Sequence, residues 1–278
     1  MQLSINAAHF RKNRAGLPER NLTECLSLVH NAGFRAVDLN TRDEDPAEVR
    51  AFLAKKGMYV NQSHLPFNRY KRADFTVFSA EMMRCARTAQ QLDSKILVVH
   101  GDEFDAAQQP YTKQAVLEFN KRLFTPLVDF AVQHGMKVAF ECVFEESIAS
   151  LVPRFCSKTE DLLTLVQHFS SEHVGVCWDF GHVKVQYGPK MAEELRKAAP
   201  YLIATHVHDN YYQKDLHLFP FLGDTDWETN MRILQQEHYS GDLTFEFGYE
   251  NIPDALLPEY LHLIYKTGEY LLNMATKS

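Results

Sequence analysis

Short apolar runs alternate with longer amphipathic segments along the whole chain. The runs are rich in Val, Ile and Phe and are too short to be helices, as expected of strands that are buried on both faces. Between them, apolar residues recur at helical spacing, for example at Leu162, Leu165 and Phe169. Eight strands are predicted, at residues 3–6, 36–39, 59–64, 96–100, 137–141, 174–179, 202–206 and 243–246.

Glycines mark the boundaries between these elements. Gly33, Gly57, Gly135 and Gly241 each follow a helical segment and precede a new apolar run, where glycine can end the helix in the left-handed conformation. Regular alternation of strands and helices implies a parallel sheet with right-handed crossovers. Eight such units in 278 residues predict an α/β fold, a (β/α)8 TIM barrel, which needs about 250 residues. A doubly wound sheet of five or six strands is the alternative.

Composition narrows the class of protein. Hydrophobic residues make up 45% of the chain, enough for a large core, and no composition break divides it, so we expect a single TIM-barrel domain over residues 1–278. The net charge of −7 argues against a basic surface for nucleic acid. No apolar stretch approaches the roughly 18 residues of a membrane span. Five scattered cysteines and the absence of a signal-like N-terminal segment indicate a cytoplasmic protein.

Potential cation ligands follow six of the predicted strands. These strand-end residues are His64, His100, Glu141, Asp179, His206 and Glu246, and the adjoining loops add His182, Asp215 and His217. In a barrel the carboxyl ends of all strands open at one mouth, so residues far apart in sequence become neighbours there. Mixed imidazole and carboxylate donors suit a divalent metal such as Zn, Mn, Fe or Co, with Mg also open, and the lack of cysteine ligands argues against a structural zinc site.

Each of these residues has a simpler interpretation when it is taken alone. A single histidine is more often a hydrogen-bonded core or surface residue than a ligand. Asp179 alone is consistent with a helix N-cap, and His9, which follows the first strand, is ambiguous. The repetition on successive strands favours a shared metal site over these separate explanations.

Five short motifs carry a resemblance to a known family. They are VAFE with Glu141, CWDFGH with Asp179 and His182, THVHDN with His206 and His208, DLH with Asp215 and His217, and LTFE with Glu246. Together, and over nearly the whole chain, they resemble the xylose isomerase-like TIM-barrel superfamily. That superfamily includes sugar phosphate isomerases and epimerases and the apurinic endonuclease family 2.

The resemblance implies a set of site residues. In the ketose epimerases one cation is held by two glutamates, an aspartate and a histidine, which match Glu141, Asp179, His206 and Glu246. His208 is the alternative to His206, because both point to the same face of the strand. The endonucleases use additional ligands for a three-metal cluster, and their counterparts would be His64, His100, His182, Asp215 and His217. Cys142 departs from the pattern, since many relatives have asparagine there.

The leading hypothesis is isomerisation or epimerisation of a sugar or sugar phosphate by proton transfer through a metal-stabilised enediolate. Glu141 and Glu246 would act as general base and acid, Asp179 and His206 as fixed ligands, and His182 would hold a substrate oxygen or a second metal. We expect a small-molecule partner and a homo-oligomer.

Three alternatives stay open. They are phosphodiester hydrolysis of the apurinic endonuclease type, a metal-dependent dehydratase acting on a cyclitol or keto acid, and a barrel that only binds a ligand. The acidic net charge opposes the first, because duplex binding requires basic residues against phosphates. Few such residues are expected near the mouth: Arg69, Lys71, Arg72, Arg154, Lys184 and Lys214.

Overall fold

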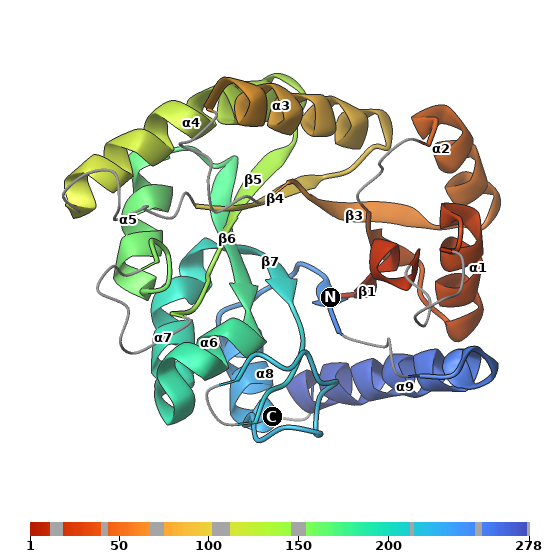
Figure 1. The fold of residues 1–278 in the computed structure, drawn as a ribbon. Coiled ribbons are helices and arrows are strands. Elements are labelled where there is room, and N and C mark those ends of the chain that lie inside the picture. Colours follow the sequence, from red (N-terminus) through yellow and green to blue (C-terminus); the bar gives the residue numbers. More distant parts are fainter. Residues whose placement is uncertain are drawn as a thin grey trace.

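The chain folds into a closed barrel of parallel strands surrounded by helices (Figure 1). The computed structural model describes residues 1–11, 19–39, 44–66, 75–101, 112–145, 154–211, 214–247 and 252–276. Its strands are β1 (Leu3–Asn6), β2 (Ala36–Asp38), β3 (Tyr59–His64), β4 (Ile96–His100), β5 (Lys137–Glu141), β6 (Val174–Asp179), β7 (Leu202–His206) and β8 (Leu243–Phe245). The predicted strands agree with these, except that β2 and β8 each end one residue earlier.

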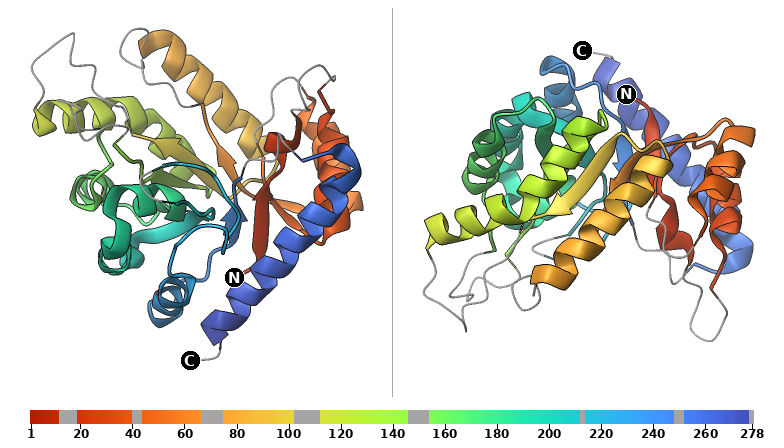
Figure 2. Two further views of the ribbon diagram at one scale, coloured as in Figure 1. Left: turned by 60° about the horizontal axis from the view of Figure 1, so that its bottom comes forward. Right: turned by 90° about the horizontal axis from the view of Figure 1, so that it is seen from above.

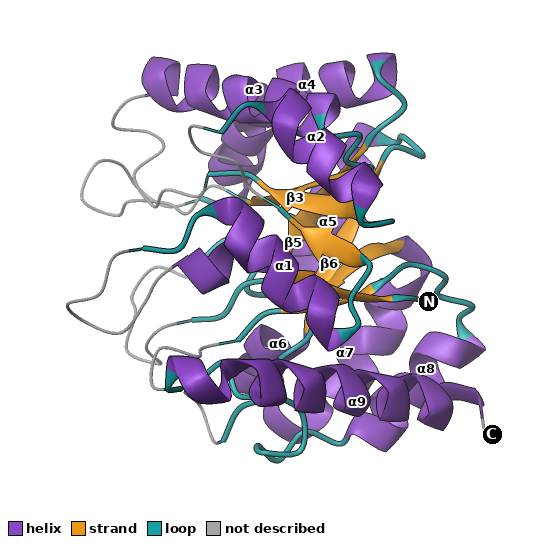
Figure 3. Cartoon of the chain, turned by 90° about the vertical axis from the view of Figure 1, so that its right-hand side faces the viewer, coloured by secondary structure: helices purple, strands orange, loops and turns teal. Residues whose placement is uncertain are grey.

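Helices follow the strands and cover the outside of the barrel, as Figure 3 shows. The α-helices are α1 (Leu22–Ala32), α2 (Pro46–Lys55), α3 (Phe75–Gln91), α4 (Lys113–Gln133), α5 (Thr159–Phe169), α6 (Phe180–Tyr187), α7 (Met191–Ala198), α8 (Trp227–Gln236) and α9 (Leu257–Thr276). Within the described ranges, none of these helices is long and apolar enough to cross a bilayer.

Strand pairing distinguishes the barrel from the doubly wound sheet. The strands pair in parallel in the order β7-β6-β5-β4-β3-β2-β1-β8, so β1 lies between β2 and β8. The ring closes where Val207 bridges to Phe245, through hydrogen bonds from Val207 N to Thr244 O (2.7 Å) and from Glu246 N to Val207 O (3.2 Å). A doubly wound sheet would leave two free edges. The predicted (β/α)8 fold is therefore confirmed.

The two ends of the described chain meet in the wall of the barrel. Figure 2 shows α9 lying alongside β1 and α1. Gly268 permits this close approach, because a Cβ at that position would lie 2.8 Å from the Leu3 side chain and from the Phe245 ring.

The prediction that glycine follows a helix with a positive φ angle is confirmed at three of the four glycines. Gly33, Gly57 and Gly135 have positive φ angles of 123°, 62° and 65°. The prediction is wrong at Gly241, since α8 ends at Gln236 and His238 adopts the left-handed conformation instead, with φ 57°. Gly241 is needed for space, because a Cβ there would lie 2.4 Å from the Tyr239 hydroxyl oxygen.

The interior of the barrel has an apolar half and a polar half. Val98, Ala139, Cys177 and Ala204, from β4 to β7, form a small buried apolar cluster. On the other side, Ser4, Asn61, Thr244 and Gln62 form a buried hydrogen-bonded chain. Its links are Ser4 Oγ to Asn61 Oδ1 (2.7 Å), Asn61 Nδ2 to Thr244 Oγ1 (3.0 Å) and Thr244 Oγ1 to Gln62 Oε1 (3.2 Å). This chain connects β1, β3 and β8 inside the ring.

Replacing Asn61 with leucine should reduce stability, because the buried hydroxyls of Ser4 and Thr244 would each lose a partner. We expect the free energy of unfolding to fall by about 1–3 kcal/mol, the usual cost of an unsatisfied buried polar group. Urea denaturation of Asn61→Leu, Ser4→Ala and the double variant measures this. The two losses should not add, since Ser4 and Asn61 share a hydrogen bond. Additive losses, or none for Asn61→Leu, would contradict the account.

Candidate metal centre

The strand-end residues singled out from the sequence meet at one mouth of the barrel. His64, His100, Glu141, Asp179 and His206 are the last residues of β3 to β7, and Glu246 directly follows β8. All strands run in the same direction, so these side chains emerge at the same end. Glu141, Asp179 and His206 are almost fully buried, with relative exposures of 1%, 0% and 0%.

Three carboxylates converge on a single nitrogen atom of His206. We call Glu141, Asp179, His206 and Glu246 the first ligand group. His206 Nδ1 lies 3.3 Å from Glu141 Oε2, 3.7 Å from Asp179 Oδ2 and 3.2 Å from Glu246 Oε2. This nitrogen is buried and has no hydrogen-bond partner among the described residues. Asp179, His206 and Glu246 form one set whose ligand atoms lie within 4.8 Å of one another and that could hold a cation, and Glu141 reaches the same nitrogen from a neighbouring set.

Residues inside the barrel fix the orientation of the His206 ring. The amide nitrogen of Gln62 lies 2.9 Å from His206 Nε2, and Asp38 Oδ2 lies 3.7 Å from the same atom. One ring nitrogen therefore faces the polar half of the interior, while the other faces the carboxylates. Cys177 also lies beside His206, but burial raises the pKa of its thiol to about 12, so it remains a protonated and poor ligand.

Glu141 is shared between the first ligand group and two further histidines. Its Oε2 lies 3.0 Å from His64 Nε2 and 3.1 Å from His100 Nε2. Burial opposes ionisation, but His100 and His206 outweigh it and hold the pKa of Glu141 well below its usual value. Glu141 is thus an ionised carboxylate surrounded by imidazoles, and His64, His100 and Glu141 form a set that can hold a cation.

Glu246 is the most accessible member of the first ligand group. Its side chain is 12% exposed, and its Oε1 lies 3.3 Å from His9 Nε2 while its Oε2 faces His206. Burial opposes ionisation of this residue as well, and the charges of His206 and His9 outweigh it, so the pKa of Glu246 is lowered. Glu246 Oε2 thus faces the place that a cation held by the first ligand group would occupy, and Glu246 Oε1 points away from that place.

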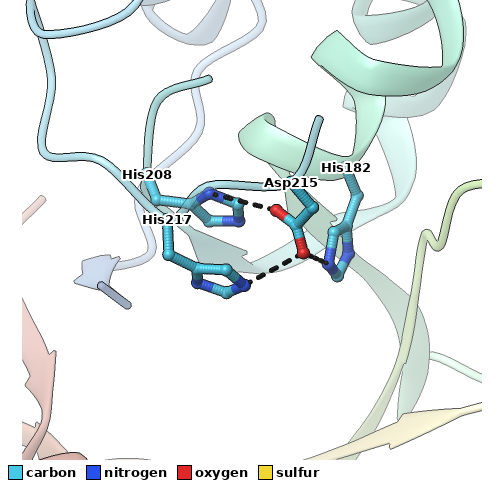
Figure 4. Close-up of side chains that lie close together, drawn as sticks. All are labelled: His182, His208, Asp215 and His217. Atoms are coloured by element: carbon cyan, nitrogen blue, oxygen red, sulfur yellow. Dashed lines mark hydrogen bonds and ion pairs between the residues drawn. The ribbon is translucent and has the colours of Figure 1, made fainter. Parts of the chain in front are cut away.

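A second ligand group lies beside the first and consists of His182, His208, Asp215 and His217 (Figure 4). Asp215 Oδ2 lies 3.1 Å from His217 Nε2 and 3.7 Å from His182 Nε2, and Asp215 Oδ1 lies 3.8 Å from His208 Nδ1. The rings of His208 and His217 stack, with centroids 4.0 Å apart. Burial lowers the pKa of His217, but Asp215 and Glu246 outweigh it and raise the pKa to about 9.

The structure separates the positions of His206 and His208, which the sequence left as alternative candidates. His206 faces the three carboxylates of the first ligand group. His208 lies behind Asp179, with its Nε2 2.9 Å from Asp179 Oδ1. Asp179 also accepts a hydrogen bond from the backbone N–H of His182 (2.7 Å), so it caps α6 and lies in the ligand group at the same time.

Sequence reasoning missed three supporting residues. Asp38 ends β2 and Gln62 lies on β3, and both contact His206 from within the barrel. Asp38 lay inside the strand predicted at residues 36–39, so the strand-end pattern that singled out the other candidate ligands did not include it. Cys142, where the resemblance implied asparagine, accepts a hydrogen bond from Asp179 N through its sulfur (3.0 Å), so its role is to hold Asp179.

Two of the basic side chains expected near the mouth make local contacts, and a third, Lys214, is exposed. Arg154 Nη1 donates a hydrogen bond to Phe144 O (2.9 Å), and Lys184 Nζ pairs with Asp224 (3.0 Å). Arg69, Lys71 and Arg72 lie outside the described residues.

Comparisons with known proteins agree with this architecture. The family model described as xylose isomerase-like TIM barrel matches residues 26–266. The uncharacterised protein y4fM of Sinorhizobium fredii is 28% identical over 261 residues, which cover 82% of this chain and 81% of that protein. A solved D-tagatose 3-epimerase-like protein has a TM-score of 0.78 at 18% identity and covers 99% of this chain and 100% of that chain.

The IOLI protein, solved with a bound zinc atom, also has a TM-score of 0.78, at 17% identity, and the match covers 100% of this chain and 99% of that chain. At such low identity the two structural matches show the fold alone. The family model spans most of the chain, and the protein therefore belongs to the xylose isomerase-like TIM-barrel family.

Proposed function

We propose that the protein is a divalent-metal-dependent isomerase or epimerase that acts on a sugar or sugar phosphate. The observation that carries the proposal is the convergence of Glu141, Asp179 and Glu246 on His206 Nδ1 at the mouth of the barrel. The family supports it, as does the structural similarity to a D-tagatose 3-epimerase-like protein and to a protein that binds zinc.

Both glutamates are suited to act as bases at neutral pH. The lowered pKa values of Glu141 and Glu246 keep them ionised, and Glu246 has an oxygen directed away from the cation position. A bound cation would stabilise negative charge on substrate oxygen as the adjacent carbon loses its proton. Glu246 would remove or return that proton on the accessible side, and Glu141 would do so from the buried side.

Asp179 and His206 would act as fixed ligands. The backbone N–H of His182 and the His208 ring donate to the Asp179 carboxylate, Asp179 N donates to the sulfur of Cys142, and Gln62 contacts the His206 ring. Such outer contacts hold ligands in position. His182, whose ring is 10% exposed beside Glu141, is placed to bind a substrate oxygen.

Phosphodiester hydrolysis is a second candidate, favoured by the additional ligand sets. His64, His100 and Glu141 form one set and His182, His208, Asp215 and His217 form another, and both lie next to the first ligand group. Several cations in one site can activate water and stabilise a leaving oxygen. The net charge of −7 and the local pairing of Arg154 and Lys184 oppose binding to a polyanion.

Substitution of Glu246 with glutamine should lower kcat by about 10²–10⁴, because the amide cannot accept the proton. Epimerisation of a panel of ketoses and ketose phosphates measures this, with cation content determined by elemental analysis. Glu246→Gln should keep most of its cation, whereas Glu141→Gln should lose cation as well, since Glu141 is shared with His64 and His100. The exposed Glu228→Gln on α8 is the matched control. Unchanged kcat in Glu246→Gln would remove its proposed role.

Cation affinity should rise with pH up to about 9. His217 is protonated at neutral pH because its pKa is raised to about 9, and a cation can bind its nitrogen only after that proton leaves. For one released proton the affinity for Zn²⁺ changes roughly tenfold per pH unit. Calorimetric titrations between pH 6.5 and 9, in buffers of different ionisation enthalpy, count the protons released. His217→Gln should release fewer. A pH-independent affinity would contradict this expectation.

The two candidate functions differ in their response to DNA. The protein should neither bind an abasic duplex in a salt-sensitive manner nor cleave it, because it lacks the charge to offset several phosphates. Gel analysis of a labelled abasic duplex with Zn²⁺, Mn²⁺ or Mg²⁺, using the same preparation that is tested on ketoses, measures this. Cation-dependent cleavage that disappears in Glu141→Gln would favour the phosphodiesterase.

A further inference from the structure

An apolar face lies on the outside of the barrel, on α9 and on the segment that precedes α8. It consists of Leu256, Leu263, Tyr270, Phe221 and Leu222, which are between 46% and 56% exposed and make up five of the ten large apolar side chains that the described residues expose. α9 runs along the periphery of the molecule (Figure 3), and the rings of Phe221 and Tyr270 lie with their centroids 5.8 Å apart. The segment and the helix therefore form one surface, and contiguous exposed apolar surface marks a site of interaction.

The α9 part of the apolar face is a straight stripe. Leu256, in the 3-10 turn that directly precedes α9, is seven residues from Leu263, and Leu263 is seven residues from Tyr270. Seven residues make almost two full helical turns, so the three side chains lie on one line along the helix. The residues that α9 buries in the core, such as Leu261 and Ile264, lie on its other side. Packing within the chain therefore does not require an apolar stripe here.

Phe221 is held in this face by a strained backbone. Its φ angle is 75°, in the left-handed region that disfavours bulky side chains. The backbone N–H of Phe221 donates to Asp209 Oδ2 (3.0 Å), and the fully buried Asp209 accepts a second hydrogen bond on the same oxygen from Trp227 Nε1 (2.9 Å). The chain thus fixes a costly conformation that leaves the phenyl ring 47% exposed. Strain that the surrounding structure maintains in this way indicates a surface shaped for function.

We propose that the apolar face binds the same face of a second copy of this chain, with the two α9 helices antiparallel and a two-fold axis beside Leu263. A two-fold interface needs a self-complementary surface. The stripe meets this need, because Leu256 and Tyr270 are equally distant from Leu263 along the helix. Antiparallel pairing places Leu263 opposite itself and Leu256 opposite the Tyr270 of the second copy. Phe221, which contacts Tyr270, then covers the same leucine.

The charges beside the stripe favour a second copy in the antiparallel orientation. Glu259 lies four residues before Leu263 and Lys266 three residues after it, and both are exposed. At 3.6 residues per turn they lie on the same side of the stripe. Antiparallel pairing brings each Glu259 beside the Lys266 of the other copy, whereas parallel pairing would bring like charges together. Lys266 also pairs with Glu269 in its own helix (2.7 Å), but such an exposed pair contributes little and does not hold the lysine there.

Sedimentation velocity of the purified full chain over a range of concentrations tests the association. The wild type should form a species of twice the 32.1 kDa mass of the chain. Leu263→Asp places two carboxylates opposite each other at the two-fold axis, so it should raise the dissociation constant of the dimer about 100-fold. Val132→Asp is the matched control, because Val132 is 47% exposed on α4, away from the apolar face, and this variant should dimerise as the wild type does.

Charge reversal separates a second copy from any other partner. Glu259→Lys and Lys266→Glu each create two like-charge contacts in an antiparallel dimer, so each should weaken it about 3–10-fold. The double variant restores opposite charges and should dimerise as the wild type does. Both positions are exposed on α9, so these variants decide the matter even if Leu263→Asp does not fold. Single variants without effect, or a double variant weaker than both, would exclude the antiparallel pairing.

A symmetric cross-link locates the two-fold axis. Helices packed about 8–10 Å apart bring facing Cα atoms close enough for a disulfide. Because the five native cysteines are buried, Leu263→Cys adds the exposed thiol, and mild oxidation should join two chains on a non-reducing gel, whereas Val132→Cys should not cross-link. A wild type that is monomeric at every concentration, or Leu263→Asp that dimerises normally, would overturn the inference. These experiments need neither cation nor substrate, so their outcome is independent of the proposed function.

Discussion

Three carboxylates and an imidazole lie together, largely buried, at one end of the barrel. The electrostatic free-energy cost of burying these groups side by side is the constraint on which the rest of the structure depends. Like charges repel, and burial penalises each of them. The molecule offsets this cost with histidines, which contact Glu141 from β3 and β4 and Glu246 from the segment after β1. A closed ring of strands is the scaffold that can hold these groups together, because each strand is fixed by two neighbours.

The polar half of the barrel interior helps to hold the buried groups of the site in position. The buried chain from Ser4 through Asn61 and Thr244 reaches Gln62, and Gln62 holds the ring of His206. The orientation of the central imidazole is thus connected to β1, β3 and β8. An entirely apolar interior would pack as well but would leave Nε2 of His206 without a partner. The polar half of the barrel therefore supports the candidate metal centre.

The fold and the position of the candidate ligands at the strand ends were predictable from sequence because both depend on local patterns. Short β-branched runs gave the strand positions to within one residue, and a polar residue at the end of such a run is visible without a structure. The choice between His206 and His208 was not predictable, because residues two apart share a face, and only the position of Asp179 separates them. Asp38 was overlooked inside a predicted strand, and Gly241 was misassigned because its role is to make space for Tyr239.

The small apolar cluster of Val98, Ala139, Cys177 and Ala204 has a consequence for exchange with solvent. It fills the barrel between β4 and β7, while Asp179 and His206 are fully buried and Glu246 alone in the first ligand group has more than a trace of exposure. Within this group Glu246, with 12% of its side chain exposed, is the member that solvent reaches most readily. Shielding the ligands from water and leaving a base open to substrate are therefore opposing demands on the same side chain.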